Sequence, residues 1–149
     1  MRQRKQQTFA FRARTIANNR SARKVGPVSG RLAAIAVDCL DTELMSAFWS
    51  TALGARITST WTDSHGKRYV ELGSGLPEST EPVLLLQPVT NHEVSKNRLH
   101  LDIRPQHSDQ HAEVMRLFAA GAHVTDWAAE DPWIVMSDPE GNEFRVLPP

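Results

Sequence analysis

The apolar residues of this chain change their spacing several times, and each spacing predicts an element of secondary structure. An apolar segment from Arg31 to Cys39 predicts a first strand. Between Asp41 and Gly54 the apolar residues follow the 3.6-residue period, which predicts an amphipathic helix that begins after Asp41 and ends at Gly54. Its expected apolar stripe is Leu44, Met45, Phe48, Trp49, Ala52 and Leu53. Three short strands are predicted to follow, at about 56–61, 68–72 and 83–88.

The same order of elements returns 67 residues later. A strand is expected at 98–103, and a helix is expected between a cap at Ser108 or Asp109 and a stop at Gly121. The stripe of this second helix is predicted to be Val114, Leu117 and Phe118, and strands are predicted at 123–127, 133–137 and 143–147. The chain therefore predicts an α+β fold of two βαβββ modules, at about 31–89 and 97–149, which are each too small to be stable alone.

The last predicted hairpin places charged residues on one face of a strand. Pro139 and the pair Gly141-Asn142 favour a tight turn after Asp138. In the strand that follows, alternation turns Glu143 and Arg145 to one side and the apolar residues to the other. Charged residues that share a face opposite a buried apolar face suggest a polar pocket.

The charge of the chain divides it into two parts. Residues 1–31 contain nine Lys or Arg and no acid, whereas the remaining 118 residues contain eight Lys or Arg and all 17 acids. Residues 1–30 form no sustained apolar pattern, so we expect a basic, disordered extension before a domain at 31–149. Three roles of this basic extension stay open: it contacts nucleic acid, it is an organellar transit peptide, or it has no function.

Composition narrows the class of protein. The chain has 149 residues, 40% of them hydrophobic and 23% charged, which is typical of one globular domain. No apolar run approaches the roughly 18 residues of a membrane helix, so we expect no membrane partner. The single cysteine, Cys39, excludes an internal disulfide, fits a cytoplasmic location and is expected in the core.

The repeat and its motifs resemble the vicinal oxygen chelate superfamily, which includes glyoxalase I, bleomycin-resistance and fosfomycin-resistance proteins and extradiol dioxygenases. Three segments carry the resemblance: Asp41 to Gly54, Lys96 to Asp102, and Trp133 to Asn142. They are most similar to the glyoxalase-like branch found in actinobacteria. The resemblance implies a curled mixed sheet that forms a cup, with the helices on its convex face, a small organic ligand in the cup, and a homodimer.

The resemblance also implies where a metal would bind. Metal-using relatives place one ligand on each of the first, fourth, fifth and eighth strands. In this chain these positions fall on Ala34, on Gln87 in an uncertain register, on His100 and on Arg145. Because a catalytic metal needs about three protein ligands, we expect no cofactor. The alternative is a divalent metal held by His100 and Glu143.

Without a metal, the expected cup is a polar site. His100 and Glu143 are the candidate catalytic residues, since an imidazole near a carboxylate can act as a base near neutral pH. Arg145 is expected to clamp a carboxylate or phosphate of a ligand in bidentate fashion. Further candidates for ligand binding are Asp102, Asp38, Trp133 and Gln87, and Trp61 and Trp127 could also line the cup.

Three classes of function are thus distinguished. The leading one is a metal-independent protein that binds a small organic molecule, either to sequester it or to perform acid–base chemistry on it. The first alternative is a metal-dependent lyase, isomerase or dioxygenase of the glyoxalase type. The second is an interaction with nucleic acid or protein through the basic extension, which we place after the other two classes. A purely structural network, in which Arg145 neutralises Glu143 and Asp102, also stays open.

Overall fold

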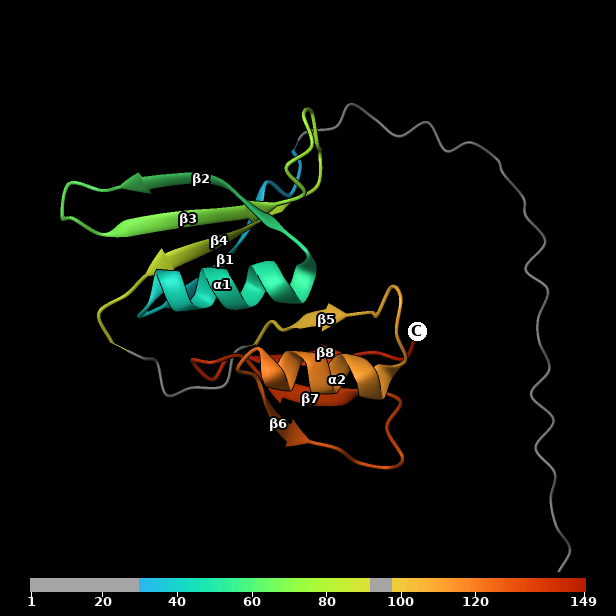
Figure 1. Ribbon diagram of the computed structural model, residues 1–149. Coiled ribbons are helices and arrows are strands. Elements are labelled where there is room, and N and C mark those ends of the chain that lie inside the picture. Colours follow the sequence, from blue (N-terminus) through green and yellow to red (C-terminus); the bar gives the residue numbers. More distant parts are fainter. Residues whose placement is uncertain (1–29, 92–97) are drawn as a thin grey trace, which may run out of the picture. The chain divides into compact units, whose positions relative to one another are not determined.

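The computed structural model describes residues 30–91 and 98–149, and the elements in them follow the predicted order (Figure 1). The first module comprises β1 (Ala34–Cys39), α1 (Thr42–Leu53), β2 (Arg56–Thr62), β3 (Arg68–Gly73) and β4 (Val83–Pro88). The second comprises β5 (Leu101–Ile103), α2 (Gln110–Ala119), β6 (His123–Asp126), β7 (Ile134–Ser137) and β8 (Glu143–Val146). The predicted extension at 1–30 lies outside the described residues, apart from Gly30. No helix in the described ranges is long and apolar enough to cross a bilayer.

Each module forms its own four-stranded mixed sheet. The strand orders are β1-β4-β3-β2 and β5-β8-β7-β6, so the first and last strands of each module lie side by side. These two pairs are parallel, and the other neighbours are antiparallel. Among the described residues no ladder joins β1 to β5. The α+β fold of two βαβββ modules is therefore confirmed, with one four-stranded mixed sheet in each module.

Helix α1 begins and ends where the sequence indicates. The Asp41 side chain accepts hydrogen bonds from the backbone N–H groups of Glu43 and Leu44, at 2.9 and 3.0 Å. Gly54 ends the helix with φ of 64°, a backbone conformation that glycine adopts without a Cβ clash. The predicted apolar stripe is too wide, because Leu44 and Leu53 at its two margins are both 46% exposed.

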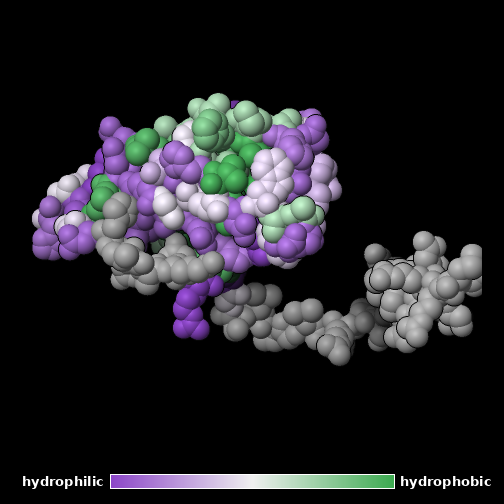
Figure 2. Space-filling view, turned by 90° about the horizontal axis from the view of Figure 1, so that it is seen from below, coloured by the Kyte–Doolittle hydropathy of each residue, from purple (hydrophilic) through white to green (hydrophobic). Residues whose placement is uncertain are grey.

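Helix α2 also buries a narrower face than predicted. Asp109 is the N-cap, and its side chain accepts from the backbone N–H of Ala112 at 2.8 Å. Val114 and Leu117 are buried, but Phe118 is 53% exposed. Figure 2 shows that hydrophobic and hydrophilic residues are mixed on the face of the molecule seen from below Figure 1. A short helix over a small sheet covers only its central stripe, so a residue one position further around faces solvent.

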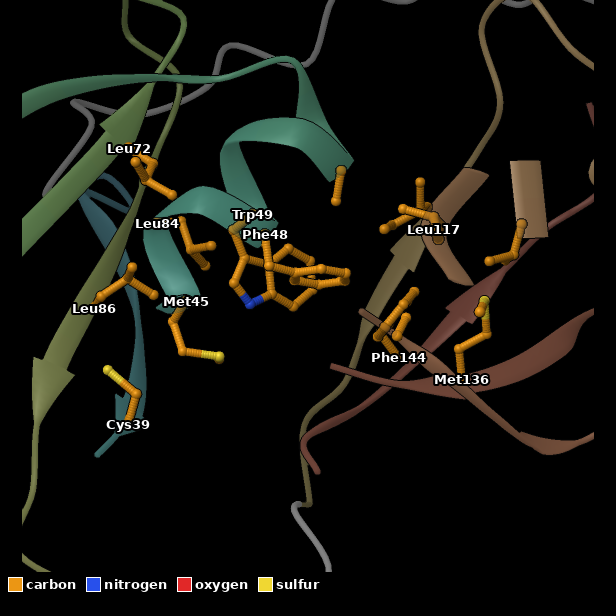
Figure 3. Close-up of a cluster of buried hydrophobic side chains, with 14 of the residues drawn as sticks. Cys39, Met45, Phe48, Trp49, Leu72, Leu84, Leu86, Leu117, Met136 and Phe144 are labelled. Atoms are coloured by element: carbon orange, nitrogen blue, oxygen red, sulfur yellow. The ribbon is translucent and has the colours of Figure 1, made fainter. Parts of the chain in front are cut away.

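Phe48 and Trp49 of α1 join the two modules through one apolar core (Figure 3). Their rings meet edge to face with centroids 5.1 Å apart, and Trp49 meets Phe144 of β8 at 5.4 Å. Side chains of both sheets surround this aromatic cluster. Such aromatic pairs contribute about 0.5–1.5 kcal/mol each beyond their burial. The face of α1 therefore belongs to both modules at once.

The turn between β7 and β8 attaches the second module to α1. The Asp138 carboxylate is fully buried and accepts four hydrogen bonds. One comes from Trp49 Nε1 at 3.3 Å, and the others come from Glu140 N, Asn142 N and Asn142 Nδ2. Burial raises the pKa of the Asp138 carboxyl, and the hydrogen bonds that it accepts oppose that rise.

Charged side chains of the second module lie at both ends of α1. Glu140 accepts hydrogen bonds from the backbone N–H groups of Leu40 and Asp41, both at 2.7 Å, next to the start of the helix. Arg116 of α2 donates to the carbonyls of Thr51 and Ala52 in the last turn, at 2.8 and 3.2 Å. A carboxylate at the start and a guanidinium at the end match the helix dipole.

Cys39 is in the core, as predicted. Its thiol is fully buried and donates to the carbonyl of Gln87 at 3.8 Å. Burial, followed by the charges of Glu140 and Asp138, raises the pKa of the thiol to about 12. The thiolate is the reactive form of cysteine, so burial and these charges disfavour a nucleophilic role for this side chain.

We predict that Asp138→Asn destabilises the domain by about 2–3 kcal/mol. All four partners of the carboxylate are donors, so an amide NH₂ in place of one oxygen would face a donor and leave it without an acceptor. Urea unfolding measures the change. Asp131→Asn is the matched control, because Asp131 is exposed and should tolerate an amide. Equal stability of the two variants would contradict the role given to Asp138.

Candidate functional site

Alternation along β5 and β8 separates a core face from a polar face. Phe144 and Val146 are buried in the core, while Glu143 and Arg145 lie on the opposite face of β8. On β5, Asp102 lies directly beside Arg145 in the parallel ladder. The predicted facing of these charged residues is therefore found in the structure.

Arg145 and Asp102 form a bidentate ion pair. Arg145 Nε donates to Oδ1 of Asp102 at 2.8 Å, and Nη2 donates to Oδ2 at 3.0 Å. Burial by itself raises the pKa of Asp102, but the hydrogen bonds and charge of Arg145, with a smaller contribution from His100, lower it overall. Asp102 is thus held as a carboxylate, and Arg145 is held in one orientation.

The other side of Arg145 is occupied as well. Its guanidinium carbon lies 5.0 Å from the ring centre of Trp133, a cation–π arrangement. The Nε–Nη2 edge of the guanidinium is used by Asp102. The predicted bidentate clamp on a ligand would therefore use the Nη1–Nη2 edge, and it stays a prediction.

His100 extends the ion pair into a three-residue network. Its Nδ1 lies 3.1 Å from Oδ1 of Asp102, and its side chain is 39% exposed. Glu143 lies on the same polar face, one residue pair along β8 from Arg145. The structure thus brings together four of the predicted site residues: His100, Asp102, Glu143 and Arg145.

The first module contributes a second polar pair. Asp38 on β1 and Gln87 on β4 are register partners, and Gln87 Nε2 donates to Oδ1 of Asp38 at 3.1 Å. Gln87 therefore acts on Asp38, and it does not line the cavities that contain His100. Its uncertain register is resolved, because it is the direct neighbour of Asp38.

A cavity of about 370 Å³ lies where β1 of the first module meets the start of β5 and β8 of the second. Asp38, His100 and Glu143 all line it. Apolar walls come from Ile35, Ala36, Val37, Trp49, Leu99 and Leu101. A smaller hollow of about 180 Å³ is lined by His100, Glu143, Arg145, Trp133, Val135 and Phe144. His100 and Glu143 thus line both spaces.

Two residues of the larger cavity were not singled out from the sequence. Arg98 and Asn142 line it beside Glu143. Both belong to motifs that carry the family resemblance, but their orientation depends on where the strands begin. The strand expected at 98–103 begins only at Leu101, and Leu99 before it is 69% exposed. With the alternation absent before Leu101, the sequence could not show which side chains turn to the cavity.

The remaining tryptophans lie elsewhere. Trp61 stacks on Tyr69 in the first sheet with ring centres 5.2 Å apart, and Trp127 contacts His111 of the second module at 4.8 Å. Neither lines the cavities that contain His100. Of the candidate tryptophans, only Trp133 joins the polar site.

The side chains at the positions where the resemblance implies metal ligands do not form a set that fits a divalent metal. The first-strand position is Ala34, and the eighth-strand position is Arg145, whose positive charge is bound to Asp102. In residues 30–91 and 98–149 no three His, Cys, Asp or Glu side chains group closely enough to hold an ion. A catalytic metal needs about three protein ligands, and a guanidinium among them would repel the ion.

Two βαβββ modules with their first and last strands paired, and a polar cavity where the modules meet, define a protein of the vicinal oxygen chelate type. A family model described as a glyoxalase-like domain matches residues 34–147. The chain therefore belongs to the glyoxalase-like family. Among curated proteins, no sequence matches it.

Solved structures with the same fold include enzymes and resistance proteins. Fosfomycin resistance protein FosX from Listeria monocytogenes, complexed with Mn(II) and sulfate, has a TM-score of 0.60 at 15% identity, covering 80% of this chain and 92% of that one. FosX from Mesorhizobium loti gives 0.63 at 13% identity, with 81% and 92% covered. Leishmania major glyoxalase I gives 0.60 at 20% identity, with 80% and 87% covered. At these identities the likeness shows the fold alone.

We predict that Arg145→Met lowers the stability of the domain by roughly 1 kcal/mol at neutral pH, the scale of a well-aligned pair that is partly exposed. The pKa of Asp102 is lowered from 3.8 in the folded protein. The contribution of the pair is therefore present above pH 3.8 and is lost as the pH falls through the folded pKa. Urea unfolding of both proteins from about pH 7 to pH 3 measures this.

Arg68→Met is the matched control for this test. Arg68 pairs with Glu43 at 3.1 Å, but both side chains are well exposed, at 44% and 83%. We expect a smaller loss of stability for this variant. A stability difference for Arg145→Met that stays constant across the acid range would show that the ion pair does not hold Asp102 in its charged form.

Proposed function

We propose that this protein binds a small organic molecule in the cavity of about 370 Å³ between its modules, and that it does so without a metal. The observation that carries the proposal is the bidentate pair between Arg145 and Asp102. It places an internal positive charge, already matched to a carboxylate, at the position where the resemblance implies a metal-binding carboxylate.

The lining of the cavity supports a ligand with an apolar body and a few polar groups. Half or more of its lining side chains are apolar, and the polar ones are Asp38, Arg98, His100, Asn142 and Glu143. Sites for small molecules combine apolar walls with a small number of placed polar groups in this way. Arg98 lines this cavity whereas Arg145 does not, so we assign Arg98 as the cation nearest the ligand.

His100 and Glu143 are the groups in this cavity that could move a proton. An imidazole beside a carboxylate is suited to abstract a proton next to a carbonyl, as an isomerase or lyase requires. Sequestration of the ligand without reaction uses the same contacts. Ligand binding is therefore the function we propose. In an enzyme built on the same site, His100 would be the residue that moves the proton.

A metal-dependent reaction is the second candidate. The observation in its favour is that FosX from Listeria monocytogenes, a protein of the same fold, is complexed with Mn(II). His100 and Glu143 are the residues of this chain that could contribute to such a site, since both line the same cavity.

The homodimer, the cytoplasmic location and the domain boundary near residue 31 remain predictions from the sequence.

Thermal unfolding in the presence of 2-oxo acids, thiol conjugates and planar aromatic compounds tests the proposal. A ligand at 100 times its Kd adds about 2.7 kcal/mol, which raises Tm by roughly 10 °C for a domain of this size. We predict that Ala36→Leu, which fills the cavity, abolishes the shift produced by any compound found in this way. Ala119→Leu, on the exposed surface of α2, should leave the shift unchanged.

Mn²⁺, Zn²⁺ and a chelator form the second arm of this experiment. If the site is metal-independent, neither ion raises Tm and the chelator does not lower it, with or without the organic compound. Elemental analysis of the purified protein should find less than one divalent ion per chain. A stoichiometric metal, or a ligand shift that the chelator removes, would decide for the metal-dependent candidate.

A further inference from the structure

We infer that Asp102, held by Arg145, is a positioning residue that keeps His100 in the tautomer with the proton on Nδ1 and thereby leaves Nε2 as a proton acceptor. The inference rests on the proposed function only for the identity of the group that donates a proton to Nε2. The tautomer itself is a property of the protein without ligand.

The geometry of the network leaves little freedom to Asp102. Two hydrogen bonds from Arg145, one to each carboxylate oxygen, hold the carboxylate in the plane of the guanidinium. The backbone adds to this, because Asp102 and Arg145 are register partners in the β5–β8 ladder. Trp133 packs against the guanidinium from another side, at 5.0 Å.

The charge of Asp102 then decides the state of His100. An ionised carboxylate only accepts hydrogen bonds, and a neutral imidazole has one donor and one acceptor nitrogen. Since Nδ1 lies 3.1 Å from Oδ1 of Asp102, the contact is a hydrogen bond only if Nδ1 carries the proton. Nε2 is consequently the nitrogen with the lone pair.

The remaining nitrogen belongs to a side chain that lines the cavity. His100 borders both the space of about 370 Å³ and the hollow of about 180 Å³, and it is half-exposed. Nε2 can accept a proton from a hydroxyl, a thiol or a C–H group next to a carbonyl. The proton passes to Nε2 and leaves its electron pair on the ligand, and the imidazolium that forms lies beside the Asp102 carboxylate. Return of the proton to another ligand atom completes an isomerisation without any oxidant or co-reactant.

Nitrogen NMR of the full chain tests the tautomer directly. Long-range proton–nitrogen correlation of ¹⁵N-labelled protein, recorded at about pH 8.5 where an ordinary histidine is neutral, distinguishes the protonated ring nitrogen from the unprotonated one. The spectrum of His100→Gln identifies which of the six histidines is His100. We expect a roughly tenfold or larger excess of the Nδ1–H form, because a hydrogen bond to a charged acceptor favours it.

Asp102→Asn provides the sharpest variant. Oδ1 of Asp102 lies within hydrogen-bond distance of both Nε of Arg145 and Nδ1 of His100. A neutral amide is a weaker acceptor than a carboxylate and has one oxygen in place of two, so we expect the excess of the Nδ1–H form to fall. Arg145→Lys keeps a positive charge but loses the fork, and we expect a smaller excess of the Nδ1–H form. Asp131→Asn, at an exposed position, should leave the His100 signals unchanged.

Two results would overturn the inference. One is a predominant Nε2–H form in the unaltered protein, and the other is a His100 tautomer that does not respond to Asp102→Asn. Failure of a variant to fold leaves the measurement on the unaltered protein decisive. The spectra are recorded without ligand, so an absence of ligand binding would contradict the proposed function and leave the assignment of the tautomer standing.

Discussion

The structure depends on how the second module holds helix α1. A small sheet and a single helix bury too little surface to be stable alone. Here the turn before β8 binds α1 at its start through Glu140 and in its middle through Asp138, and Arg116 binds its last carbonyls. Opposite charges at the two ends complement the helix dipole, and Trp49 places its ring in the core of both modules. Loss of these contacts would weaken the attachment between the two modules.

This attachment also determines where the cavity forms. Glu140 binds backbone N–H groups immediately after β1 ends, and Asn142 and Glu143 follow Glu140 within one turn. The end of β1, with Asp38, is thereby placed beside the start of β8. The same short segment therefore serves stability and site geometry, since its buried carboxylate fixes the turn and the next residues line the cavity. The turn therefore carries both residues of the family resemblance and candidate site residues.

Much of this could be predicted from the sequence, because local rules decide it. The N-cap at Asp41, the glycine at the end of α1 and the alternation in β8 each act over a few residues. The exposure of Phe118 and Leu99 and the position of Arg98 at the cavity depend on which surfaces the other module covers and on where a strand begins. No local pattern encodes either of these. The partner of Arg145 was left open between a ligand and a neighbouring acid for the same reason. Only the β5–β8 register places Asp102 directly beside it.

Arg145 stands where the resemblance to metal-using relatives implies a carboxylate, and the fold accommodates this difference. A bound divalent ion would need His100 as a ligand, with a nitrogen lone pair directed at the ion. A guanidinium brings its own positive charge and binds Asp102, and Asp102 in turn engages the imidazole. In this chain the histidine instead belongs to a network of hydrogen bonds with Asp102 and Arg145. The same fold can therefore hold different sets of side chains at these strand positions, and the chemistry has to be argued from the side chains rather than from the fold.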